Sequence, residues 1–213
     1  MPRHGPPPRL TVAVLVPVKS FAEAKLRLAP ALDPAARMRL VRTMAEHVVR
    51  AAGDLPVSVV CDDEEVADWA RAHGASVVWA PGRGLNGAVH EGVTTLAAQG
   101  ATQVVVAHAD LPLAADLGSV AGFSGVTLVP DRHDDGTNVT CVPSTADFGF
   151  SYGPGSLARH RAEALRLGLP LRILRAPLLA WDVDVPDDLD YAVAGRAFVV
   201  ERVAERDIAD RRP

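Results

Sequence analysis

Short apolar runs alternate with amphipathic stretches along the first half of the chain, and this alternation constrains the fold most. Residues 10–18 (LTVAVLVPV) form a nearly continuous apolar run, which is typical of a strand buried on both faces of a parallel sheet. A helix is then predicted from Asp33-Pro34 to about Ala52, because its apolar residues recur at helical spacing: Leu40, Met44, Val48 and Val49. Together these two segments predict a βα unit.

The same unit recurs further along the chain. Strands are predicted at Val57–Cys61, Ser76–Trp79 and Gln103–Ala107, and helices at Glu64–His73 and Leu85–Gln99. The second half is less regular, with strands near Val126–Val129, Val139–Val142 and Leu171–Leu174, a helix from Ser156 and a last helix from Pro186. The pattern predicts a doubly wound, Rossmann-like α/β fold with a mainly parallel twisted sheet flanked by helices, and some antiparallel pairing in the second half.

Length and composition restrict the class of protein. The 213 residues suit one domain, expected over residues 10–213, and the proline-rich residues 1–9 (MPRHGPPPR) are expected to be a disordered tail. A net charge of −4 argues against a nucleic-acid partner. The sequence has neither a signal peptide nor an apolar stretch long enough to span a membrane, and its two cysteines lie far apart, so a cytoplasmic protein is expected.

Asp110 is the leading candidate for chemistry. Ligands of open α/β sheets bind at the carboxyl ends of strands, so the residues after Val18, Ala107 and Val142 are the first candidates. Asp110 follows the predicted strand Gln103–Ala107 and precedes Leu111-Pro112. Its carboxylate could hold Mg²⁺ together with substrate phosphates, or it could cap the turn before the proline.

A second acid is expected in the segment 181–189 (WDVDVPDDL). Asp182 and Asp184 alternate on an extended stretch and therefore point the same way, which suits shared metal ligation. Asp184 has an alternative role as the cap of the helix that begins at Pro186. Asp187 and Asp188 are interpreted as first-turn acids that complement the helix dipole.

Three cations follow the first predicted strand. Lys19, Lys25 and Arg27 could converge on a triphosphate, or they could form a solvated basic loop. The loop matches neither of the two standard glycine-rich phosphate motifs.

Two polar turns and one helix start complete the candidates. Thr137 and Asn138 follow Gly136 in a turn that suits a small anion, and Gly153 and Ser156 lie in a glycine-rich turn whose free backbone N–H groups would face a phosphate or carboxylate. A plain solvated turn and an ordinary N-cap are the alternatives. The small residues around Leu85, Asn86 and Gly87 would let a flat base approach the backbone. No role is assigned to His90, His108 or His160.

These motifs occur together in one known family. The chain carries VKxxxxAKxRLAP, GLNGAV, ADLP, DGTN, YGPGSxxRH and DVDVPxDL from about Leu10 to Tyr191, and it resembles the 2-phospho-L-lactate / phosphoenolpyruvate guanylyltransferases of coenzyme F420 (deazaflavin) biosynthesis. This family is similar to the wider glycosyltransferase-A-type nucleotidyltransferases, including the molybdenum cofactor guanylyltransferases.

The resemblance implies transfer of GMP from GTP to the phosphate of a three-carbon acid, with release of pyrophosphate. In the actinobacterial members the acceptor is phosphoenolpyruvate and the product enolpyruvoyl-diphospho-5'-guanosine; 2-phospho-L-lactate and 3-phosphoglycerate are the alternatives. By the family pattern, Thr137, Gly153 and Ser156 match the acceptor site, Leu85 and Asn86 the guanine site, and Lys19 and Lys25 the phosphate site. Asp110 and Asp182 match the acids that hold Mg²⁺.

The sequence departs from the family pattern at two positions. Ala109 replaces the usual glycine before Asp110, and Val185 replaces a threonine. Neither change removes a carboxylate. The expected mechanism is in-line attack of the acceptor phosphate on the α-phosphorus without a covalent intermediate. The rivals are a nucleotidyltransferase for molybdopterin or a sugar phosphate, and a nucleotide-binding sensor without turnover.

The resemblance also implies hand-off of the product to a downstream deazaflavin transferase. The apolar run 197–200 (AFVV) is expected to cover either a partner, in a homodimer, or the chain's own sheet.

Overall fold

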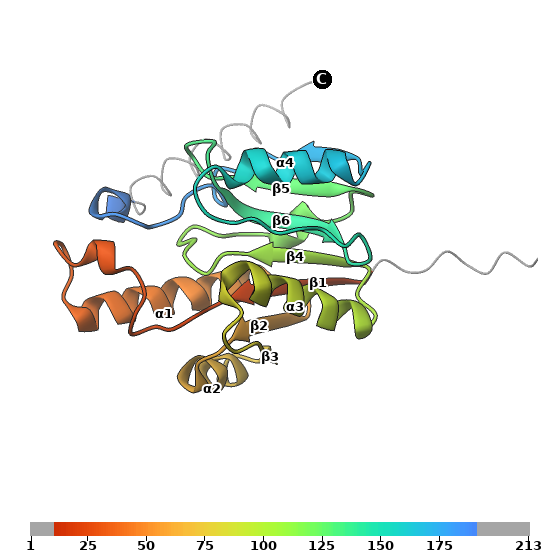
Figure 1. Ribbon diagram of the computed structural model, residues 1–213. Helices are drawn as coiled ribbons and strands as arrows, with labels where there is room; N and C mark the ends of the chain where they lie inside the picture. Colours follow the sequence, from red (N-terminus) through yellow and green to blue (C-terminus); the bar gives the residue numbers. More distant parts are fainter. Residues whose placement is uncertain (1–10, 191–213) are drawn as a thin grey trace, which may run out of the picture.

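A seven-stranded sheet forms the centre of the part of the chain described by the computed structural model, residues 11–190 (Figure 1). Its order is β3-β2-β1-β4-β6-β5-β7. The strands are β1 (Val12–Pro17), β2 (Val57–Cys61), β3 (Ser76–Trp79), β4 (Gln103–Ala107), β5 (Val126–Pro130), β6 (Thr137–Pro143) and β7 (Leu171–Ile173). The tail predicted at residues 1–9 and the apolar run 197–200 lie outside the described residues.

One strand runs against the others. β1 pairs in parallel with β2 and β4, β2 with β3, and β5 with β7, whereas β6 is antiparallel to both β4 and β5. The predicted mainly parallel α/β sheet is therefore confirmed, as is some antiparallel pairing. The expectation of a site after Val142 is wrong, because the reversed β6 brings its beginning, at Thr137 and Asn138, to the edge where β1, β2 and β4 end.

Within residues 11–190, four α-helices cover the sheet: α1 (Pro34–Ala51), α2 (Glu64–Ala72), α3 (Gly84–Ala98) and α4 (Ser156–Arg166). Two begin at side-chain caps, since Asp33 accepts the Ala36 N–H at 2.7 Å and Asp63 accepts the Val66 N–H at 3.1 Å. Short 3₁₀ turns form at η1 (Leu26–Leu28), η2 (Leu117–Val120) and η3 (Pro186–Asp190). The helix predicted from Pro186 is a 3₁₀ turn as far as it is described.

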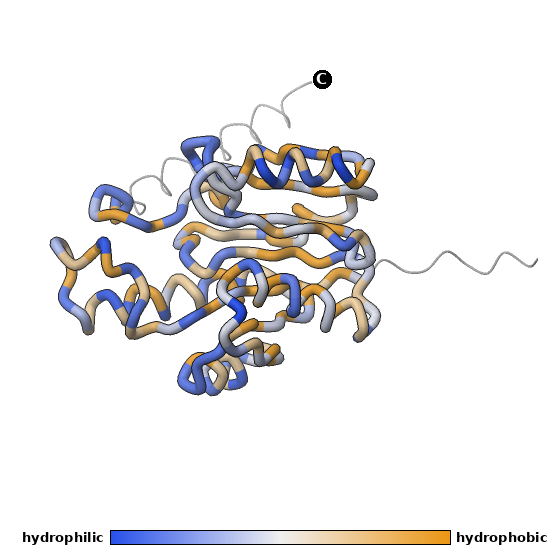
Figure 2. Tube along the Cα trace, in the orientation of Figure 1, coloured by the Kyte–Doolittle hydropathy of each residue, from blue (hydrophilic) through white to orange (hydrophobic). Residues whose placement is uncertain are grey.

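The sheet separates two apolar clusters because neighbouring strand residues point to opposite faces. On β1, Val14 and Val16 belong to the cluster that includes residues of α1 and α2, while Ala13 and Leu15 belong to the cluster that includes residues of α3 and α4. Figure 2 shows hydrophobic residues along the strands and mixed colours on the helices. α3 lies especially close to β1, since a Cβ on Gly92 would come within 2.5 Å of the Leu15 side chain. Among residues 11–190, no helix is both long and apolar enough to cross a membrane.

Candidate active site

A cleft follows the edge where β1, β2 and β4 end. It consists of two adjoining cavities of about 310 Å³ each, which share Pro17, Val18, Lys19 and Leu85 in their walls. The first lies between the ends of β1 and β2 and the start of α3, and its further walls include Asp62, Ala80, Gly82 and Gly84. The second reaches to Lys25, His108 and Asp110. A ligand whose flat group occupies the first cavity would therefore extend through the second cavity to Asp110.

Lys25 connects two of the predicted acids. Its Nζ lies 2.5 Å from Asp110 Oδ2 and 2.6 Å from Asp184 Oδ1. The Lys25 backbone is left-handed, with φ at 56°, and this turns the chain into η1. Burial alone would lower the pKa of Lys25, but the two carboxylates outweigh it and raise this pKa above its ordinary value. The lysine is therefore a permanent cation at the end of the cleft.

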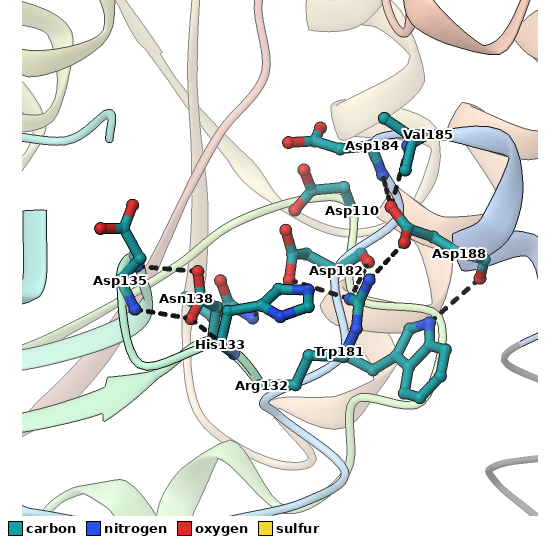
Figure 3. A network of polar contacts seen from close by, with 12 residues as sticks. Asp110, Arg132, His133, Asp135, Asn138, Trp181, Asp182, Asp184, Val185 and Asp188 are labelled. Carbon is teal, nitrogen blue, oxygen red and sulfur yellow. Dashed lines mark hydrogen bonds and ion pairs between the residues drawn. The ribbon is translucent and has the colours of Figure 1, made fainter. Parts of the chain in front are cut away.

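Asp182 completes an acidic group with Asp110 and Asp184 (Figure 3). Its Oδ1 accepts a hydrogen bond of 3.3 Å from Asn138 Nδ2. Burial, together with the charge of Asp110, raises the pKa of Asp182, so this carboxylate lacks full compensation by cations. Asp110 Oδ1 is buried and has no hydrogen-bond partner among residues 11–190.

The donor set fits a magnesium ion only in part. Within residues 11–190, no three His, Cys, Asp or Glu side chains form a ready-made metal cluster. Magnesium in nucleotide sites takes one or two protein carboxylates and completes its shell with phosphates and water. The unpartnered oxygen of Asp110 and the neighbouring Asp182 meet that smaller requirement.

Arg132 and Asp188 surround the acidic segment, as Figure 3 shows. Arg132 forms an ion pair with Asp188 and stacks over Trp181 at 4.5 Å. Asp188 accepts the backbone N–H groups of Asp184 and Val185 at 2.6 and 2.8 Å. Asp187 and Asp188 lie in the first turn of η3, as predicted, and the Asp188 side chain is in addition buried and hydrogen-bonded. The cap alternative for Asp184 is not realised, since Asp188 accepts these N–H groups while the Asp184 carboxylate contacts Lys25.

The three predicted cations do not converge. Lys19 lines both cavities, with its side chain 80% exposed and 3.9 Å from Glu23. Lys25 faces the acids. Arg27 is exposed and lines neither cavity, because η1 turns the chain after Lys25.

The predicted acceptor residues gather around α4, but they are mostly closed to solvent. Thr137 and Ser156 are almost completely buried, and Thr137 Oγ1 lies 3.1 Å from His160 Nδ1. The backbone N–H groups predicted to be free already have protein acceptors: Gly155 and Leu157 donate to Asp135, and Ser156 donates to the Gly153 carbonyl. Gly155, with φ at 71°, precedes the helix, so the N-cap alternative for Ser156 is wrong.

Of the residues predicted to lie beside the nucleotide base, one lines the cleft and two do not. Leu85 lines both cavities. Asn86 instead accepts the Tyr152 N–H at 2.7 Å, and Gly84 and Ala88, rather than Gly87, line the first cavity. Asp62 was missed, although it follows the strand Val57–Cys61 and the rule that selected Asp110 would also have selected it.

His108 was likewise given no role, yet it lines the second cavity. Its ring lies 4.6 Å from that of Tyr152, and its buried Nε2 has no hydrogen-bond partner in the described part of the chain. His160, by contrast, is a packed histidine, whereas His90 is exposed. The position of His108, two residues before Asp110, was the available signal.

Comparison with known proteins decides the family. The family model described as "Guanylyl transferase CofC like" matches residues 12–195. The chain belongs to this guanylyltransferase family. A phosphoenolpyruvate guanylyltransferase of Sphaerobacter thermophilus is 38% identical over 89% of this chain and 96% of its own length. One of Rubrobacter xylanophilus is 37% identical over 84% and 92%.

Solved structures support the fold of this guanylyltransferase. A Desulfovibrio desulfuricans protein described as a nucleotide-diphospho-sugar transferase superposes with a TM-score of 0.70 at 16% identity, covering 84% of this chain and 85% of its own. A Methanothermobacter nucleotidyl transferase gives 0.60 at 16% identity, over 90% and 99%. The predicted enzyme class, a nucleotidyltransferase, and the predicted fold are both confirmed.

The two departures from the family pattern leave the acids of this guanylyltransferase in place. Ala109 lines the second cavity beside Asp110, whose carboxylate still reaches Lys25. Val185 uses its backbone N–H, not its side chain, to bind Asp188.

Proposed function

We propose that the protein transfers GMP from GTP to phosphoenolpyruvate in the biosynthesis of coenzyme F420. The products would be enolpyruvoyl-diphospho-5'-guanosine and pyrophosphate. The observation that carries this proposal is the continuous cleft that leads from the ends of β1 and β2, past Lys19, to Asp110. Its shape suits a nucleoside triphosphate, and two relatives that cover most of the chain are named for this acceptor.

The first cavity would hold the guanine. Its apolar walls, Pro17, Val18 and Leu85, suit the faces of a flat base. Asp62 offers a carboxylate there, and guanine presents N–H donors that a carboxylate can accept. The phosphates would then extend through the second cavity, where Lys19 and Lys25 offset their charge.

The reaction needs no general base. An oxygen of the acceptor phosphate, already anionic, attacks the α-phosphorus and forms the new P–O bond. The bond to the β-phosphate's bridging oxygen breaks, and pyrophosphate leaves with the electron pair. The protein's contribution would be to position both phosphates and to neutralise charge.

Magnesium is the proposed cofactor, with Asp110 and Asp182 as its protein ligands and Asp184 as an additional acid beside them. When bound, it would supply positive charge that lowers the repulsion between the phosphates. Two observations support these ligands: within residues 11–190 the buried Asp110 Oδ1 has no hydrogen-bond partner, and Asp182 lies in the same acidic group, oriented by Asn138 (Figure 3).

The acceptor would bind between Asn138 and the turn at Gly153, next to the acids. The buried Thr137 and Ser156 would then form the floor of this site. The anhydride product would require a downstream transferase to consume it.

Parallel incubations with GTP and Mg²⁺ test this proposal. Phosphoenolpyruvate, 2-phospho-L-lactate and 3-phosphoglycerate are supplied separately, and the product mass and released pyrophosphate are measured. The expected result is fastest product formation with phosphoenolpyruvate. Preference for another acid would overturn the acceptor assignment, and GTP binding without pyrophosphate release from any acid would indicate a sensor instead.

A further inference from the structure

The segment that carries Asp182 and Asp184 has no regular secondary structure of its own. Residues 181–184 belong to neither a helix nor a strand, and η3 begins only at Pro186. Irregular backbone does not fix a side chain by itself, so contacts from elsewhere must hold the two carboxylates beside Asp110. Figure 3 shows which residues make those contacts.

Arg132 binds this segment from the end of β5. Its backbone N–H donates to the Ala180 carbonyl at 2.8 Å, and its Nη1 donates to the Asp182 carbonyl at 3.0 Å. Its guanidinium also stacks on Trp181 and lies 3.6 Å from the Asp182 carboxylate. One arginine therefore fixes the backbone on both sides of Trp181 and places a positive charge beside Asp182.

Asp188 binds the same segment from the other end. Its side chain is only 5% exposed, and both of its oxygens are used. Oδ1 pairs with Arg132, while Oδ2 accepts the N–H groups of Asp184 and Val185. The Asp188 carbonyl accepts the Trp181 indole N–H at 3.0 Å. The result is a closed ring of contacts around the acidic segment.

We propose that Arg132 and Asp188 are positioning residues that hold Asp182 and Asp184 in register with Asp110. They would contact neither nucleotide nor acceptor. Their effect would be on affinity for the divalent cation, because that affinity depends on how well the acids are oriented before the cation arrives. This inference rests on the proposed function for the identity of the bound species, but its test does not require turnover.

The Asp188→Asn variant tests the proposal. The amide oxygen can still accept the N–H groups of Asp184 and Val185, but the amide nitrogen then faces Arg132, which offers only donors. Binding of Mn²⁺ to the full chain with GTP is measured by electron paramagnetic resonance, without acceptor. The expected result is about 10- to 100-fold weaker Mn²⁺ binding. Steady-state assays should show a similar rise in the Mg²⁺ concentration for half-maximal rate, with KM for phosphoenolpyruvate changed less.

Asp134→Asn is the matched control. Asp134 also pairs with an arginine, Arg175, but both side chains are largely exposed, at 48% and 68%. Its Mn²⁺ affinity should equal that of the wild type within about twofold, as expected for a surface pair. Should Asp188→Asn fail to fold, Arg132→Lys replaces it, since lysine keeps the charge and loses the forked contact.

Unchanged Mn²⁺ affinity in a folded Asp188→Asn or Arg132→Lys variant would overturn the proposal. A wild-type protein that binds Mn²⁺ with GTP but transfers no GMP would overturn the proposed function alone. The two failures are therefore distinguishable.

Discussion

Replacing Lys25 by methionine should destabilise the protein measurably in the absence of divalent cations. Methionine keeps the aliphatic volume and removes the charge that lies between Asp110 and Asp184. Removing one partner of a fully buried ion pair costs about 3–5 kcal/mol. Lys25 is 13% exposed and Asp110 21%, but Asp184 is 49% exposed, so water screens part of the loss. The expected loss in free energy of unfolding is about 2–3 kcal/mol.

Urea denaturation in the presence of a chelator measures this difference. Lys19→Met is the matched control, because Lys19 is 80% exposed and its ion pair with Glu23, at 3.9 Å, is long. This variant should lose less than about 1 kcal/mol of its free energy of unfolding. Mg²⁺ should restore part of the stability of Lys25→Met, since a cation that binds only the folded acids favours the folded state. Equal stabilities for the two variants would refute the view of Lys25 as the cation that holds these carboxylates together.

Three further predictions address the site and the core. Asp110→Asn should keep the fold, seen by circular dichroism, and lower turnover at least about 100-fold; near-normal pyrophosphate release would contradict the metal assignment. Burial, followed by the charge of Arg159, lowers the pKa of His160 to about 4, so only the unfolded chain takes up this proton between pH 6.5 and about 4. Stability should therefore fall as the pH drops through that window, by on the order of 3 kcal/mol from this group, and urea titrations of His160→Asn should show a flatter dependence. Gly92→Ala should cost about 1–3 kcal/mol in thermal unfolding because its Cβ meets Leu15; an unchanged melting temperature would mean that α3 can move away from β1.

The sheet was predictable because its signal is local. Each buried strand appears in the sequence as an apolar run. The helices α1 and α2 each follow an aspartate cap, and their apolar residues recur at helical spacing. The direction of β6 was not predictable in the same way, because a strand of this composition suits either orientation. As a result, the end of β4 before Asp110 lies at the same edge as the ends of β1 and β2, whereas the end of β6 at Val142 lies at the opposite edge.

The site was predictable only as far as single motifs extend. Asp110, Lys25 and Asp184 were selected individually, and the structure brings them together over separations that sequence spacing does not encode. The Arg132–Asp188 pair joins residues 56 positions apart. Arg132 lies in none of the motifs, and Asp188, although part of DVDVPxDL, was interpreted only as a first-turn acid. Thr137 and Ser156 show the opposite error, since their polar character suggested exposure and the fold buries them.

The pairing of β4 with β6 has a consequence for sequence change in this protein. Ala107 pairs with Val139, and the His108 N–H donates to the Asn138 carbonyl at 3.1 Å, so the ladder itself sets the spacing between Asp110 and Asn138. Insertions or deletions in the surface turns between these strands can then change loop length without altering that spacing. A shift of one residue in the ladder would have a larger effect, because it would turn Asn138 to the other face of the sheet and away from Asp182.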